Sequence, residues 1–141
     1  MNGKRPTSGE RRAAIAVWAA FLMVLVVGMV AFGVDVGYMT LTRAQLQNAA
    51  DASAMAAAAV MAEPDAVVHS TAQEYAGYQV AAGNNVLLSN DDVEFGVWNV
   101  DSRQFTPTGT RGNAIRVTAY RQNAGLFFGG ILGRQTFTAS A

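Results

Sequence analysis

The chain has 141 residues, of which 51% are hydrophobic and only 14% are charged, and it contains no cysteine. This length fits one modest domain or a membrane segment followed by a small domain, and the lack of cysteine excludes disulfides and thiolate metal sites. The formal net charge of zero combines a basic beginning (residues 1–12), an acidic middle (residues 13–100) and an arginine-rich end (residues 101–141).

The first predicted element is a transmembrane helix that begins at Ala13 and ends at Val34. This stretch, AAIAVWAAFLMVLVVGMVAFGV, has no charged residue, Asn, Gln or Pro. As a helix it is about 33 Å long, enough for a hydrocarbon core of roughly 30 Å. The positive-inside rule places the basic residues 1–12 in the cytoplasm and everything from Asp35 onward outside. A cleaved signal peptide and a buried soluble helix are the alternatives, but the stretch is too long for the first and apolar on every face.

Beyond this stretch no helix breaker occurs before Pro64, so we expect one continuous helix from about Ala13 to Met61. Its outer part is rich in alanine and almost free of charge, which favours close packing over a solvated spacer. Small side chains four residues apart also mark helix crossings in membranes. The predicted helix-packing residues are Ala16, Ala20, Gly33, Gly37, Leu46, Ala50, Ser53 and Ala57.

A second helix is predicted to begin at Asp65 and to end near Ala82, folding back on the first as a helical hairpin. Residues 35–83 would then form an extracytoplasmic helical region. The apolar spacing of the second helix predicts one buried side. That side comprises Val68, Ala72, Tyr75 and either Gln79 or Val80.

Residues 84–141 are predicted to form a small β-rich domain. Stretches 93–100, 113–121 and 135–141 are rich in β-branched and aromatic residues, which favours a small antiparallel sheet of about three strands. The apolar stretch 124–133 is too short to span a bilayer. We expect it to be a helical turn or loop packed on the sheet, with an exposed partner-binding spot as the alternative. The predicted fold class is therefore α+β.

Nothing in the sequence predicts catalysis. The common nucleophile, metalloprotease, phosphate-loop and dinucleotide motifs are absent, and the single histidine, His69, is expected to be a surface residue. Asp91, Asp92 and Glu94 form an acidic turn that lacks the spacing of an EF-hand calcium loop. The C-terminal arginines have no aromatic stacking platforms, which argues against nucleic-acid binding. We expect neither an enzyme nor a metal or cofactor site.

The segment DVGYMTLTRAQLQNAADASAMAAAA, residues 35–59, resembles the region after the membrane helix in Tad (tight adherence) Flp-pilus assembly proteins of the TadE/TadG-like type. The shared pattern is an apolar helix, an acidic residue with a glycine and an aromatic, a basic residue, Leu-Gln, Asn-Ala-Ala-Asp and an alanine run. The matching residues are Asp35, Gly37, Tyr38, Arg43, Leu46, Gln47, Asn48, Ala49, Ala50, Asp51 and Ala52. The later stretches NAIRVTAYR and LFFGGILG resemble the C-terminal part of TadG-like chains more weakly.

The resemblance implies a bacterial inner-membrane protein with its bulk outside the cytoplasm. Its implied role is a non-enzymatic structural or assembly component of a Tad-type pilus or a related secretion apparatus. The implied partners are the lipid bilayer and other pilus-assembly or secretion proteins, and the alanine-rich helix adds self-association. A pilin-like subunit that leaves the membrane for a filament is one alternative, and a ligand- or surface-binding module on an anchor is another. No Gly followed five residues later by Glu precedes the apolar stretch, which argues against prepilin-type processing.

Overall fold

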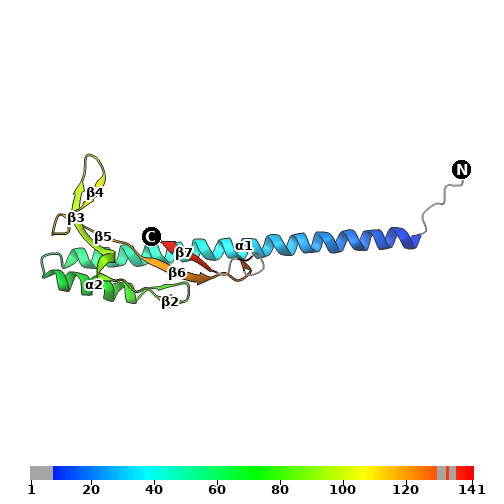
Figure 1. Ribbon diagram of the computed structural model, residues 1–141, viewed down its shortest axis with the longest axis horizontal. Coiled ribbons are helices and arrows are strands. Elements are labelled where there is room, and N and C mark those ends of the chain that lie inside the picture. Colours follow the sequence, from blue (N-terminus) through cyan, green and yellow to red (C-terminus); the bar gives the residue numbers. More distant parts are fainter. Residues whose placement is uncertain (1–7, 130–132, 134–135) are drawn as a thin grey trace.

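The computed structural model describes residues 8–129, 133 and 136–141. Helix α1, Ser8–Ala59, contains 52 residues, which corresponds to roughly 78 Å of helix. The predicted continuous helix is therefore confirmed. Figure 1 shows that the N-terminal half of α1 extends away from the molecule, while every other element lies along its C-terminal half.

Helix α1 ends where its sequence stops supporting an α-helix. The amides of Val60 and Met61 donate to the carbonyls of Ala57 and Ala58, three residues earlier, which tightens the last turn. Pro64 then precedes helix α2, Asp65–Gly77, with an extended backbone (φ −54°, ψ 148°). Proline suits this position because it lacks the amide hydrogen that a first helical turn leaves unpaired. The turn reverses the chain and lays α2 against α1, as the predicted hairpin requires.

Helix α2 is shorter than expected, because the chain leaves the helix after Gly77 instead of near Ala82. A small antiparallel pair follows, β1 (Val80–Ala81) and β2 (Asn84–Asn85). Its turn residues have positive φ, 50° at Ala82 and 76° at Gly83, a conformation that suits two-residue hairpin turns.

The buried side of α2 differs in part from the predicted one. Tyr75, which we expected inside, is 47% exposed. Of the two alternatives for the last position, Gln79 is half-buried and Val80 is 50% exposed. Val68, Ala72 and Ala76 are buried instead, at a spacing of four residues. The prediction is therefore correct for Val68 and Ala72 and wrong for Tyr75, whose place on the buried side is taken by Ala76. Gln79 and Val80 lie beyond the end of the helix.

The β-rich part confirms the α+β class but is divided differently from the prediction. Strands β3 (Val93–Asn99), β4 (Gln104–Pro107) and β5 (Ala114–Val117) form an antiparallel sheet in the order β4-β3-β5. Strands β6 (Tyr120–Gly125) and β7 (Thr136–Ser140) form a separate antiparallel pair. The single strand expected over 113–121 is thus two strands in two sheets, and β4 lies between two of the predicted strands, where we expected none.

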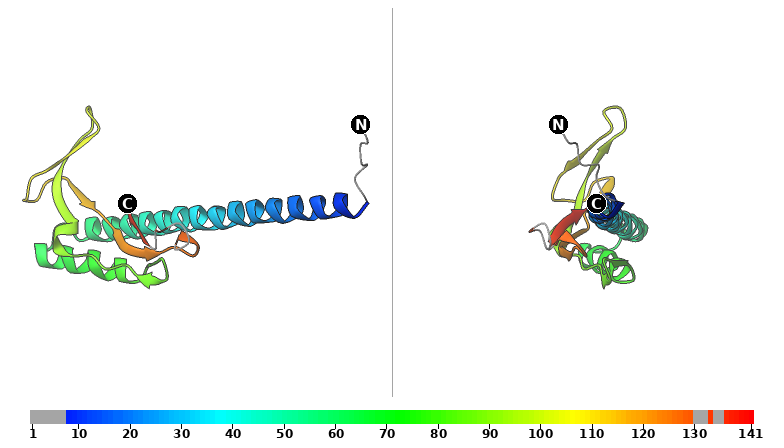
Figure 2. Two further views of the ribbon diagram at one scale, coloured as in Figure 1. Left: turned by 45° about the vertical axis from the view of Figure 1, so that its right-hand side comes forward. Right: turned by 90° about the vertical axis from the view of Figure 1, so that its right-hand side faces the viewer.

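The β3–β4 hairpin projects from the body of the molecule (Figure 2). Gly96 of β3 and Gly112 before β5 permit the close crossing at its base. A Cβ on Gly96 would collide with the ring of Phe105, and one on Gly112 would collide with the Gly96 carbonyl. These two glycines are therefore needed for the approach of the strands.

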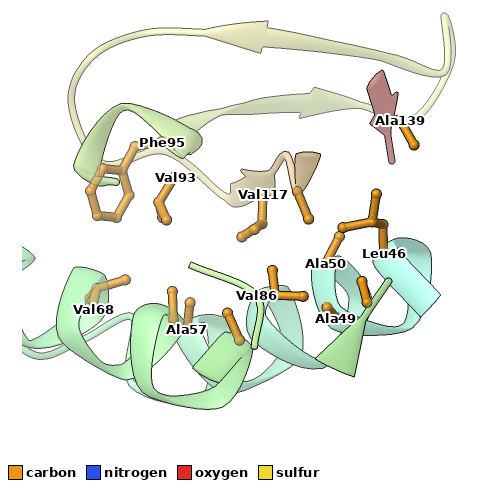
Figure 3. Close-up of a cluster of buried hydrophobic side chains, with 14 residues drawn as sticks. Leu46, Ala49, Ala50, Ala57, Val68, Val86, Val93, Phe95, Val117 and Ala139 are labelled. Atoms are coloured by element: carbon orange, nitrogen blue, oxygen red, sulfur yellow. The ribbon is translucent and has the colours of Figure 1, made fainter. Parts of the chain in front are cut away.

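The hydrophobic core lies between the outer half of α1, helix α2 and the strands (Figure 3). Helix α1 contributes mostly alanines to it, which let α2 and the strands approach the α1 backbone closely. Larger side chains from the opposite elements fill the remaining space. The core residues include Leu46, Ala49, Ala50, Ala57, Val68, Ala72, Ala76, Val86, Val93, Phe95, Val117, Ala119 and Ala139.

Candidate functional site

The predicted span, residues 13–34, lies in the part of α1 that packs against almost nothing. Its bulky side chains are open, with Trp18 65%, Phe21 56% and Met29 75% exposed. By length and composition α1 is the one helix of the described chain that is long and apolar enough to cross a membrane. The small residues expected at crossings, Ala16 and Ala20, are exposed here as well.

Gly33 and Gly37 continue this open surface toward the outer half of α1. A Cβ built on either glycine would meet nothing within 4 Å. Among the residues that the structure describes, no packing contact therefore requires a glycine at either position. A surface without Cβ atoms is the kind of helix face that allows another helix backbone to come close.

Asp35, directly after the predicted span, is only 6% exposed. Its carboxylate accepts backbone N–H bonds from Phe127 (2.9 Å) and Phe128 (3.2 Å). One turn later, Tyr38 packs edge-to-face against Phe127 and Phe137, with centroid distances of 5.2 and 6.1 Å. These two residues of the family motif therefore attach the C-terminal segment to α1, which sequence reasoning did not reveal.

Four predicted packing residues, Leu46, Ala50, Ser53 and Ala57, are buried against the chain's own elements. Leu46, Ser53 and Ala57 have no exposed surface, and Ala50 has 4%. The neighbours are α2 and the strands of the same chain, as Figure 3 shows for most of them. A second chain cannot use these residues while the domain stays folded.

The opposite face of the same helical segment stays open and polar. Arg43, Gln47, Asn48 and Asp51 of the family motif are all exposed. The Gln47 amide donates to the Asp51 carboxylate across one turn, at 2.8 Å. This contact is local and ties no other element to α1. The motif is thus divided between one face that packs against the domain and another face, at Gln47, Asn48 and Asp51, that the described residues leave open.

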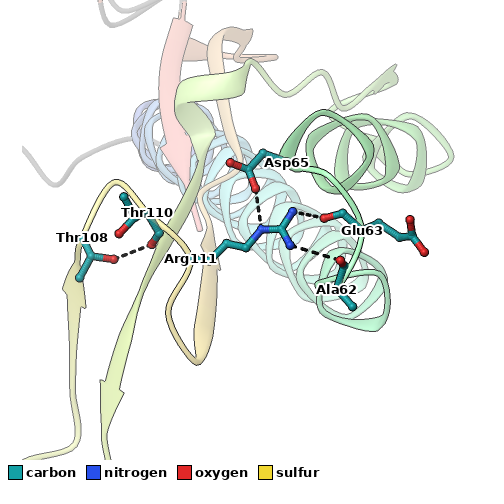
Figure 4. Close-up of polar contacts among 6 residues, drawn as sticks. All are labelled: Ala62, Glu63, Asp65, Thr108, Thr110 and Arg111. Carbon is teal, nitrogen blue, oxygen red and sulfur yellow. Dashed lines mark hydrogen bonds and ion pairs between the residues drawn. The ribbon is translucent and has the colours of Figure 1, made fainter.

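Arg111 connects the loop before β5 to the turn between the helices (Figure 4). Its Nε donates to the Asp65 carboxylate at 2.7 Å, Nη1 donates to the Ala62 carbonyl at 3.3 Å, and Nη2 donates to the Glu63 carbonyl. Arginine is suited to this task because its planar fork can serve several oxygens at once. We interpret this contact as structural. No local pattern in the sequence predicts it.

In the acidic turn at residues 91–94, the side chains of Asp92 and Glu94 are bonded to residues of the chain itself. Asp92 accepts from the amide and the hydroxyl of Ser89 at 2.7 and 2.8 Å, which forms a capping box, while Asp91 is exposed. Glu94 pairs with Arg116 at 2.6 Å. Within the described residues no group of three His, Asp or Glu side chains is placed to hold a metal ion.

Two further titratable side chains, His69 and Tyr78, contact residues of the chain itself. His69 is half-buried and packs edge-to-face on Phe95, with a centroid distance of 5.5 Å. The exposed Tyr78 hydroxyl donates to the Glu74 carboxylate at 2.6 Å, and this hydrogen bond together with the negative charge raises the pKa of Tyr78. His69 lines an open hollow with Asp91 and Glu94, but the described lining residues include no hydroxyl, thiol or amine side chain, so the arrangement does not form a nucleophile–base pair.

Two known protein families match overlapping parts of the chain, which together cover residues 13–141. Residues 38–141 match the family described as Tad-like Flp pilus-assembly. Residues 13–60 match the family described as Flp pilus-assembly TadE/G-like. No curated protein and no solved structure gives a significant match. The predicted resemblance is therefore confirmed: the chain belongs to the Tad-like family of Flp pilus-assembly proteins, and its residues 13–60 are of the TadE/G-like type.

Proposed function

We propose that this chain is a non-enzymatic, single-pass component of the Tad pilus-assembly machine, anchored in the bacterial inner membrane. Residues 13–34 cross the bilayer and residues 1–12 stay in the cytoplasm. The helical region 35–83 and the β-rich region 84–141 lie outside. The basic N-terminus beside the apolar stretch supports this orientation by the positive-inside rule.

The observation that carries this proposal is the change of environment along α1. Its large apolar residues before Asp35 are open to the surroundings, whereas its small residues after Asp35 are covered by the chain's own domain. A soluble protein rarely exposes a contiguous apolar surface of that size, because water disfavours it. A bilayer around the first half removes this conflict.

The proposed role is to supply helix faces for lateral contact within the assembly. The small-residue pairs Ala16/Ala20 inside the membrane and Gly33/Gly37 at its outer edge are open to contact with another helix. Outside it, the open face of Gln47, Asn48 and Asp51 is available to another subunit or a second copy. The buried stripe through Ala50 and Ala57, first expected to serve this purpose, instead holds the chain's own domain.

The proposal is tested by single cysteines, because the natural chain has none. Asn48→Cys lies on the open face, and Ser102→Cys, on the projecting hairpin, is the matched exposed control. In native membranes that contain the apparatus, we expect a short crosslinker to join position 48, but not 102, to a partner chain. A crosslink at 102 alone would instead favour the ligand- or surface-binding module.

The same membranes test anchoring and orientation. The chain should resist alkaline extraction, and a membrane-impermeant maleimide should label position 48, but not Gly3→Cys, in spheroplasts. Release of the chain by alkaline buffer would contradict the anchor. A mature chain shortened at its N-terminus and recovered in shed filaments would establish the pilin-like alternative.

A further inference from the structure

The segment that follows β6 lies beside α1 at the boundary of the predicted span, not over a sheet as expected (Figure 1, Figure 2). It carries two adjacent phenylalanines that the domain leaves open, Phe127 at 69% and Phe128 at 41% exposed. Residues 130–132, in the rest of this apolar stretch, lie outside the described residues. Together with the open side chains of the predicted span beside them, these two phenylalanines extend an apolar surface whose exposure to water is unfavourable.

Phe128 and the membrane segment together line one open groove of about 310 Å³. The groove runs along α1 from Asp35 back to Val24, and Val27, Gly28, Ala31 and Phe32 form its floor. With a rise of about 1.5 Å per residue, this stretch measures roughly 16 Å, about half of a hydrocarbon core. Apart from the Asp35 end the lining is apolar, so the groove continues the surface that the proposed span presents to lipid.

The carboxylate of Asp35 makes this position feasible for an irregular loop. Backbone amides that enter hydrocarbon without a partner are strongly disfavoured. Here the amides of both phenylalanines already donate to Asp35, and the amide of Phe128 reaches both carboxylate oxygens at 3.2 Å. Tyr38 adds a ring contact from the turn above. The loop is therefore attached to α1 through its backbone, while its aromatic side chains remain open.

We propose that the Phe127–Phe128 loop is a second membrane contact, in which both rings enter the outer leaflet and a phospholipid acyl chain occupies the groove beside Phe128. The inference rests on the proposed membrane anchor and deepens it. The hydrogen bonds from the loop backbone to Asp35 hold the loop at the level of the outer leaflet. The domain would then be held to the bilayer at two points, which restricts its rotation and tilt about α1.

The test measures depth directly with nitroxide labels on single cysteines in the full chain. The chain is reconstituted in vesicles of phosphatidylethanolamine and phosphatidylglycerol, and collision with oxygen is compared with collision with a water-soluble nickel chelate. Met29→Cys reports the span, Phe128→Cys the loop, and Val100→Cys, 76% exposed on the distant hairpin, the aqueous control. We expect the oxygen-to-nickel ratio at 128 to match that at 29 and to exceed that at 100.

Each outcome decides the proposal. A lipid-like ratio at 29 with a water-like ratio at 128 overturns the loop contact and leaves the anchor intact. A water-like ratio at 29 overturns both. Protection of position 128 from both reagents means that protein covers the loop, which rejects lipid as the occupant.

A second pair of variants tests whether the hydrogen bonds to Asp35 hold the loop in place. Asp35→Ala removes both acceptor oxygens, and Asp51→Ala is the control, since Asp51 is exposed and bonds only within its own helix. We expect the ratio at position 128 to fall toward the aqueous value in Asp35→Ala and to stay unchanged in Asp51→Ala. An unchanged depth in Asp35→Ala, with the label still lipid-facing, would show that Asp35 does not hold the loop.

Discussion

The two halves of α1 share one helix but follow opposite rules of burial. Before Asp35 the large apolar side chains are exposed, as Leu25 is at 49%, whereas after it small side chains such as Ala49 are fully buried. Large side chains present much apolar surface to a surrounding medium. Small ones allow α2 and the strands to approach the helix axis. Side-chain size along one uninterrupted helix therefore separates the segment suited to lipid from the segment that organises a domain.

We expect the largest difference between the two halves of α1 when one leucine in each half is replaced by alanine. Leu46→Ala empties a fully buried site and should lower the free energy of unfolding by about 2–5 kcal/mol. Leu25→Ala, in the exposed half, should leave the domain's stability unchanged. Urea titration in detergent micelles, followed by tryptophan fluorescence, measures both. Equal losses in the two variants would show that the halves are not energetically distinct.

A second pair of variants, Ala57→Leu and Ala58→Leu, tests whether the small size of the side chains is what matters in the packed half of α1. Ala57 has no exposed surface, while its neighbour Ala58 faces outward. Ala57→Leu should destabilise the domain by about 1–3 kcal/mol because the added atoms force α2 away. Ala58→Leu should have little effect in the same urea titration. If both variants unfold like the natural chain, close approach of the helices is not what the alanines provide.

The smallest of these effects concerns the turn that closes the packed half. Arg111→Lys keeps the positive charge but loses the fork that reaches Asp65 and two backbone carbonyls. Because both charged side chains are partly open to solvent, we expect a loss of about 1 kcal/mol. Arg103→Lys, at the exposed end of the β3–β4 hairpin, is the control and should be neutral. A loss in Arg103→Lys as large as in Arg111→Lys would contradict a specific role for the fork.

Local patterns predicted both helices and the strands β3, β5 and β7, because those signals lie within a few residues, but they missed β1, β2 and β4. An uninterrupted run without proline gives α1, Pro64 starts the return helix, and β-branched stretches give β3 and β7. Which face of residues 35–59 is open to a partner could not be predicted from the sequence. The sequence located the motif of residues 35–59, but it did not show that Leu46 and Ala50 face inward while Asn48 remains open.

What the sequence determined by itself is the order of environments: a basic end, a segment suited to a bilayer, an alanine-rich helix and a β-rich domain. Composition and periodicity are enough for this, because they record how apolar and how regular each stretch is. Only the tertiary structure decided what covers each face. It divided residues 113–121 between two sheets, assigned the alanine stripe to α2 and attached the Phe127 loop to Asp35. These pairings join residues far apart in the chain, and no periodic pattern encodes which distant partner fills a given space.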